Sequence, residues 1–176
     1  MKKVCISILS LAIIILSVVC IFSENTLTTT EYLRIHIRAN SNLEVDQNIK
    51  YAVKEEIVKF LTPGLSSCNT KNKAKTFLQN NLANIKSVAD TTLKTKGYKY
   101  SSRAELTNEK FPTRVYGEFV LESGFYDALI IYLGDGEGDN WWCVVYPPLC
   151  FVAGGNNVEI RSKIIDVIND FKKRFN

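Results

Sequence analysis

The residues most capable of chemistry in this chain lie between Gly134 and Val152, in the segment GDGEGDNWWCVVYPPLCFV. Three carboxylates alternate with three glycines at its start, and an asparagine and two tryptophans follow: Asp135, Glu137, Asp139, Asn140, Trp141 and Trp142. Glycine permits positive φ, so we expect the acidic part to turn sharply. Side chains alternate along extended backbone, so the two tryptophans should point to opposite faces of a strand. We interpret this segment as a recognition surface.

Three other interpretations of the acidic residues stay open. Glycosidases use a pair of carboxylates beside aromatic platforms, although catalytic groups normally sit on rigid elements and not on a glycine-rich loop. The spacing D-x-E-x-D also matches the first three ligands of an EF-hand calcium loop, but Asn140 then replaces the glycine and Tyr146 the bidentate glutamate. The third alternative is a solvated turn between two strands that binds nothing.

A second polar group lies nearer the N-terminus, where residues 33–38 alternate apolar and polar side chains as a half-buried strand does. It forms a second candidate recognition patch, made of Arg34, His36, Arg38, Asn40 and Ser41. A solvent-facing strand without a binding role accounts for the same pattern. His36 is the only histidine and no G-x-S-x-G motif is present, so we expect no catalytic residues and no cofactor.

Three of the five cysteines lie outside the N-terminal apolar run: Cys68, Cys143 and Cys150. Cys143 and Cys150 flank Pro147-Pro148, which favours a bend, so a disulfide between them is possible. It would stabilise the fold by about 2–3 kcal/mol in the chain-entropy model. Three buried free thiols are the alternative. We expect no metal site, because the chain has one histidine and no C-x-x-C pair.

The elements that position these residues follow from hydrophobic periodicity. After the strand at 33–38 we expect a helix that begins with a capping box of Ser41 and Glu44 and ends at Pro63-Gly64. A second helix should span about 70–93, and a last helix should follow a cap at Asn156-Asn157 and bury Phe171.

Gly97 marks a change from helical to strand patterns. We expect strands near 104–106, 113–121, 125–133 and 141–146, with the second and third of these joined as a hairpin. The predicted fold class is therefore α+β, with an antiparallel or mixed sheet of about four to five strands packed against about three helices.

The N-terminus carries a targeting signal. Lys2 and Lys3 precede an uncharged apolar run from Val4 to Phe22, which is typical of a secretory signal peptide but approaches the length of a membrane span. We expect residues 1–23 to be a signal peptide or an N-terminal membrane anchor and 24–32 to be a polar tether. Residues 33–176 should then form a single globular domain outside the cytoplasm.

The net charge of +4 is too small to indicate a nucleic-acid-binding protein, and no row of interleaved basic and aromatic residues is present. The short basic cluster at Lys71, Lys73 and Lys75 is interpreted as the solvated face of a helix. We therefore expect no nucleic acid among the partners.

Three stretches together resemble the stage II sporulation protein R family of endospore-forming bacteria: LRIHIRANSN at 33–42, PTRVYGEFVL at 112–121 and GEGDNWWCVVYPPLCFV at 136–152. The last stretch is the most specific of the three. The resemblance extends from about Leu33 to the C-terminal helix.

This resemblance implies a signalling protein that the forespore secretes across its membrane into the space between the two sporulating compartments. There it would activate a membrane-embedded aspartic protease, which cleaves the precursor of sigma E in the mother cell. It implies a ligand, so no catalytic residue is carried over. The alternative is an extracytoplasmic protein that binds or hydrolyses cell-wall glycan through its acidic and tryptophan residues.

Overall fold

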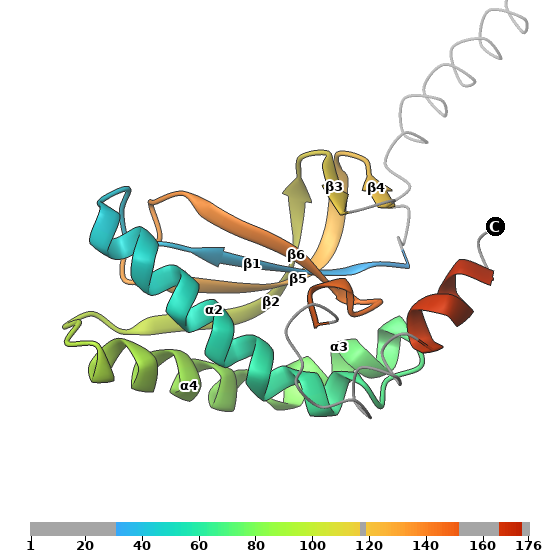
Figure 1. Ribbon diagram of the computed structural model, residues 1–176, viewed down its shortest axis with the longest axis horizontal. Helices are drawn as coiled ribbons and strands as arrows, with labels where there is room; N and C mark the ends of the chain where they lie inside the picture. The colour runs from blue at the N-terminus through green and yellow to red at the C-terminus, as the bar shows by residue number, and fades with distance from the viewer. Residues whose placement is uncertain (1–30, 117–118, 152–165, 174–176) are drawn as a thin grey trace, which may run out of the picture.

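The computed structural model describes residues 31–116, 119–151 and 166–173 (Figure 1). Helices α2, α3 and α4 cover one face of a four-stranded mixed sheet, and a two-stranded sheet lies on the opposite side (Figure 1). The predicted α+β class is therefore confirmed. The predicted leader at 1–23, most of the tether at 24–32 and the cap at Asn156-Asn157 lie outside the described residues.

The main sheet has the strand order β2-β5-β1-β6. Its strands are β1 (Leu33–Arg38), β2 (Ser102–Phe111), β5 (Gly124–Leu133) and β6 (Asn140–Tyr146). β1 runs parallel to β5, with Ile35 opposite Leu129, and antiparallel to β6. β2 pairs antiparallel with β5. The expected mixed sheet is thus built around β1 and β5 as its inner strands.

The prediction of a half-buried β1 is wrong. Leu33, Ile35 and Ile37 face the helices, but Arg34 and His36 on the other face are also fully buried. β2 and β5 are longer than β1, and in Figure 1 their far ends turn up and away from the helices toward the small sheet. Phe111 of β2 thereby packs against His36 and covers the polar face of β1.

The helical layer comprises α2 (Glu44–Leu65), α3 (Lys71–Asn80) and α4 (Leu82–Thr95). The helix was predicted to end at Pro63-Gly64, but α2 continues through both residues to Leu65, which is 1% exposed. The predicted capping box is also wrong. Ser41 Oγ accepts a hydrogen bond from Leu43 N and donates one to Asp46 Oδ2, whereas Leu43 occupies the N-cap position.

The single helix predicted over 70–93 is two helices that break at Asn81. The Asn81 side chain donates to Phe77 O at 2.8 Å, and its backbone leaves the helical region at φ −113° and ψ 9°. Asparagine commonly competes with the helix in this way, because its amide can bond to nearby backbone. Thr70 caps α3 by accepting from Lys73 N.

The stretch predicted as one strand over 113–121 forms two short strands, β3 (Arg114–Tyr116) and β4 (Phe119–Leu121). They pair with each other, with Val115 opposite Val120, so the predicted hairpin with 125–133 is wrong. β5 buries Ala128, Leu129, Ile130 and Ile131, on both of its faces. Leu129 and Ile131 lie in the helix-side core, whereas Ala128 and Ile130 pack with Phe111 on the other face, and β1 and β2 pair with the two edges of the strand.

Residues 166–173 are helical, and Phe171 is 5% exposed, as predicted. Its ring centroid lies 5.1 Å from that of Tyr32, at the start of β1. The C-terminal helix therefore packs beside the point where the described chain begins. Within the described ranges, no helix combines the length and apolar character needed to cross a membrane.

Candidate functional site: a seated acidic loop and a buried polar row

The acidic loop, residues 134–139, joins β5 to β6 across the end of β1. β5 and β1 are parallel, so their C-terminal ends lie at the same end of the sheet, where the antiparallel β6 begins. The loop must therefore pass over the turn at residues 39–42 that follows β1. This topology brings Asn40 and Ser41 of the second predicted patch next to the first.

Backbone hydrogen bonds hold the acidic loop against the turn at residues 39–42, and we call this set of contacts the seat of the loop. Four loop N–H groups donate to it: Asp135 to Asn40 Oδ1 at 3.0 Å, Glu137 to Asn40 O at 3.2 Å, Gly138 to Ala39 O at 2.9 Å and Asp139 to Asn42 Oδ1 at 2.6 Å. The loop is thus held in one shape, which the sequence pattern alone did not indicate.

Three glycines make this seat possible. Gly134 and Gly136 have φ of +57° and +69°, which confirms the expected sharp turn. A Cβ on Gly138 would lie 2.2 Å from Ser41 O, so the loop approaches the turn more closely than any other residue allows.

The buried carboxylate of Asp46 holds the turn at residues 39–42 through hydrogen bonds. Its carboxylate accepts from Tyr100 OH at 2.6 Å, Ser41 Oγ at 2.7 Å and Asn40 Nδ2 at 2.9 Å, and the residue is 4% exposed. Burial alone would raise the Asp46 pKa, but the hydrogen bonds from Tyr100, Asn40 and Ser41 outweigh it and lower the pKa. Burial, with the adjacent Asp46 charge, raises the pKa of Tyr100. Asp46 was not singled out by the sequence pattern.

Lys50 is a fully buried cation that completes the seat. Its Nζ donates to Asp139 O at 3.0 Å and to Gln47 Oε1 at 2.5 Å. Burial lowers the Lys50 pKa, and the nearby Asp139 charge opposes this shift. The end of the acidic loop is therefore tied to α2 as well as to the turn.

The seat leaves the polar side chains of the loop in solvent. Asp135, Glu137, Asp139 and Asn140 are all exposed. Leu43 and Val45, which directly follow the turn, are 66% and 57% exposed, high values for large apolar side chains. We call Asp135, Glu137, Asp139, Leu43 and Val45 the loop surface. Sequence analysis missed its apolar members, because both sit where a helix begins and carry no motif.

The two tryptophans point to opposite faces of β6, as predicted, and each is half-buried. Trp141 packs against the helix-side core, with Lys54 Nζ 6.0 Å from its ring centroid. Trp142 lies on the other face, where its ring stacks on His36 with centroids 3.8 Å apart. Both side chains thus have structural contacts of their own.

The polar residues of β1 form a buried row together with Glu109 of β2. His36 Nδ1 lies 2.9 Å from Glu109 Oε2, and Arg38 pairs with the other oxygen of the same carboxylate. Arg34 reaches the small sheet instead, where its Nη2 donates to Tyr116 OH at 2.8 Å. We call Arg34, His36, Arg38 and Glu109 the polar row. The proposed exposed patch over residues 34–41 is therefore split, because Arg34 and His36 lie inside the protein.

Burial lowers the pKa of His36 below its ordinary value of 6.5. The hydrogen bond with Glu109 and the charge of that carboxylate oppose this shift without overcoming it. The neutral form of His36 is therefore favoured at neutral pH.

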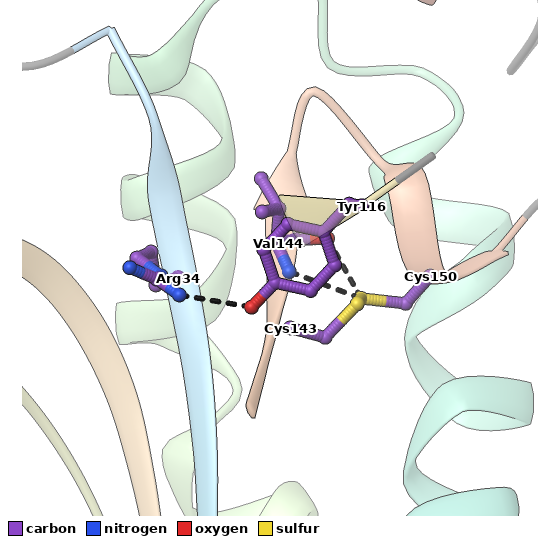
Figure 2. Close-up of a disulfide and its surroundings, with 5 residues drawn as sticks. All are labelled: Arg34, Tyr116, Cys143, Val144 and Cys150. Carbon is purple, nitrogen blue, oxygen red and sulfur yellow. Dashed lines mark hydrogen bonds between the residues drawn. A yellow bond between two sulfur atoms is a disulfide. The ribbon is translucent and has the colours of Figure 1, made fainter. Parts of the chain in front are cut away.

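Cys143 and Cys150 form a disulfide, with their Cα atoms 6.1 Å apart, as the sequence suggested (Figure 2). Val144 N lies 3.1 Å from Cys150 Sγ, so the bridge is packed against β6. Figure 2 also shows the Arg34 side chain reaching the Tyr116 hydroxyl. Cys68 is buried and free, and burial raises the pKa of its thiol.

Within residues 31–116, 119–151 and 166–173, no group of three or more histidine, cysteine, aspartate or glutamate side chains gathers as a metal site would require. The three carboxylates of the loop surface are exposed, and the backbone N–H groups of residues 134–139 already donate to other residues. Such exposed carboxylates are better suited to contact another molecule than to form an enclosed metal site or an active site.

Comparison with known proteins gives one family. The family model for stage II sporulation protein R (spore_II_R) matches residues 29–156. The stage II sporulation protein R of Bacillus subtilis (strain 168) is 33% identical over 131 residues, which cover 74% of this chain and 58% of that protein. The chain thus matches little more than half the length of that relative. No solved structure matches it. The chain belongs to the stage II sporulation protein R family.

Proposed function

We propose that this chain is an exported signal of endospore formation that activates a membrane-embedded aspartic protease and thereby causes the sigma E precursor to be cleaved in the mother cell. Membership of the stage II sporulation protein R family is the observation that carries the proposal, because it supports a role in sporulation. The protease, the precursor and the space between the compartments come from the family resemblance. The apolar run at residues 4–22 and the disulfide between Cys143 and Cys150 fit an exported, oxidised domain.

We further propose that the loop surface contacts the receptor. It combines exposed carboxylates, which accelerate association with a basic partner, with Leu43 and Val45, which can supply apolar burial. The turn at residues 39–42 holds this surface in shape before binding, so little ordering is needed on contact. The chain then acts as a ligand, with no catalytic residues and no cofactor.

Charge neutralisation at the loop tests this surface. The full chain is expressed in a non-sporulating host with the candidate protease and the sigma E precursor, and precursor length is followed by immunoblot. The variant D135N/E137Q/D139N should slow processing several-fold, because exposed charges act mainly on the association rate. The variant L43A/V45A should reduce processing further.

A matched control removes three exposed carboxylates elsewhere, as E55Q/E56Q/E122Q, and should process at the wild-type rate. Wild-type processing by both loop variants, with both exported and folded, would reject the loop surface as the contact. The glycan-hydrolysing alternative predicts a different result. If the wild-type chain released fragments from purified cell wall and D135N/E137Q/D139N lowered that rate by orders of magnitude, this alternative would replace the signalling function.

A further inference from the structure

Several buried side-chain nitrogens of the polar row lack a hydrogen-bond partner. Among the side chains that the structure describes, four buried nitrogens have no partner: Arg34 Nε and Nη1, His36 Nε2 and Arg38 Nε. All four belong to one face of β1. Buried polar groups are normally paired, and each unpaired group destabilises the fold. Three of the four nitrogens, those of Arg34 and Arg38, are N–H donors, and so many unpaired donors on one strand need an explanation.

Arg34 is the extreme member. Its side chain is fully buried, its one hydrogen bond goes to the neutral Tyr116 hydroxyl, and no carboxylate of residues 31–116, 119–151 or 166–173 pairs with it. Its guanidinium carbon lies 4.2 Å from the ring centroid of Phe111 and 4.9 Å from that of Tyr126. Aromatic rings offset part of the charge, but they leave the in-plane N–H groups without acceptors.

Lys50 shows that this fold can provide hydrogen-bond acceptors for a buried cation. It is 1% exposed, and both a carbonyl and an amide oxygen accept from its Nζ. Among the described residues, Arg34 has neither an anionic partner nor a comparable set of acceptors. The difference suggests that the Arg34 site is completed by a group from outside the domain.

We propose that Arg34 binds a carboxylate, and that this carboxylate is an aspartate or glutamate side chain of the protein partner. The planar guanidinium matches the two oxygens of a carboxylate, and the surrounding rings can hold the apolar stem of such a side chain. The identity of the carboxylate's source rests on the proposed signalling function. The carboxylate site itself rests only on the geometry around Arg34.

Entry requires Tyr116 to move. Tyr116 belongs to β3, which pairs only with β4 and forms no ladder with the main sheet. Val115 and Val120 are 66% and 55% exposed on this small sheet, so part of its apolar surface remains uncovered. An element held mainly by side chains opens at lower cost than a strand of the main sheet. The incoming carboxylate replaces the Tyr116 hydroxyl as the acceptor for Arg34.

Thermal unfolding of the full chain in mild detergent tests the site with acetate as the probe. Acetate replaces chloride at constant ionic strength, and acetamide serves as the uncharged control. Acetate at about five times its Kd should raise the Tm by roughly 2–4 °C, and acetamide should not. The variant R34M should lose this response and keep or exceed the wild-type Tm without acetate, because it removes an unpaired buried charge.

The matched control is K50M, which deletes the buried cation that has acceptors. It should lower the Tm and retain the acetate response. Equal acetate responses in wild type and R34M, or a Tm loss in R34M as large as that in K50M, would overturn the carboxylate site and make Arg34 a structural residue.

The source of the carboxylate is tested in the processing assay. R34M should reduce precursor cleavage at least about tenfold while export is retained, and R34K should restore part of it. Normal processing by an R34M protein that has lost its acetate response would overturn the assignment to a partner side chain and favour a small free carboxylate. If the wild-type chain causes no processing, the signalling function fails, while the acetate response is judged independently.

Discussion

At the scale of single residues, burial decides which polar groups carry functional meaning. Asp135 and Arg34 both looked like recognition residues in the sequence, but Asp135 is exposed and Arg34 is fully buried. The alternating sequence pattern of a strand is the same whether its polar face is exposed to water or covered by a second layer of the protein. The cover over Arg34 and His36 comes from Phe111, which lies more than seventy residues further along the chain. Local periodicity therefore could not predict it.

His36 should make stability depend on pH. Its pKa is lowered by folding, so the unfolded chain binds more protons between the ordinary value of 6.5 and the lowered value. Stability is full above the ordinary value and falls as the pH drops through that window. Because the chain has one histidine, H36F should flatten the fall in urea midpoint that wild type shows as the pH drops below about 6.5. Identical pH profiles for wild type and H36F would contradict the lowered pKa.

Asp46 should support the turn through its carboxylate. In D46N an N–H₂ group replaces one acceptor oxygen, so at least one of Tyr100, Asn40 and Ser41 loses its partner. We expect the free energy of unfolding to fall by about 1–3 kcal/mol in urea titration. The same exchange at the exposed Asp135 should change it by less than about 0.5 kcal/mol. An equal effect at both positions would show that Asp46 does not organise the turn.

At the scale of elements, the sequence predicted most helices and strands but not how they pair. β1, β5 and β6 were located within one or two residues from alternation and turn signals. The predicted hairpin between 113–121 and 125–133 failed because β5 pairs with β1 and β2, which are distant in sequence, while β4 pairs with β3. The seat of the acidic loop was equally inaccessible, since it follows from β1 and β5 being parallel.

Gly138 should be essential to the seat of the acidic loop. A methyl group there would overlap the backbone of Ser41, with atoms as close as 2.2 Å, and backbone cannot rotate away as a side chain can. We expect G138A to lower the free energy of unfolding by roughly 1–3 kcal/mol and to reduce precursor processing.

The control for G138A is G124A, where the nearest atom, in Tyr126, would lie 3.7 Å from the new Cβ. G124A should stay within about 0.5 kcal/mol of wild type in the same denaturation experiment. Wild-type stability in G138A would mean that the loop can leave the turn without loss, and the loop would then not be seated as described.

The disulfide should stabilise the segment that follows β6. Cys143 and Cys150 are separated by seven residues, and in the chain-entropy model a closed loop of this size contributes about 2–3 kcal/mol. The variant C143A/C150A should lose this amount in guanidinium titration. Added reductant should destabilise wild type and leave the variant unchanged. A wild-type protein that is insensitive to reductant would contradict a stabilising bridge.

At the scale of the whole molecule, the two faces of the main sheet are packed differently. The helix-covered face holds the main hydrophobic core, and the opposite face holds the polar row beneath a small sheet. The loop surface sits at the edge where β1 and β5 end. This division is compatible with the proposed role as a ligand, because the turn at residues 39–42 holds the loop surface in one shape.

The measurement that tests this account most directly is processing of the sigma E precursor in a non-sporulating host that carries the candidate protease. Precursor length is compared by immunoblot with the full chain, with no chain and with a chain that lacks residues 1–23. We predict that cleavage requires both the chain and its N-terminal segment, because the proposed signal would have to be exported before it meets the protease. An uncleaved precursor beside an exported, folded and oxidised domain would contradict the account, as would equal cleavage when residues 1–23 are missing.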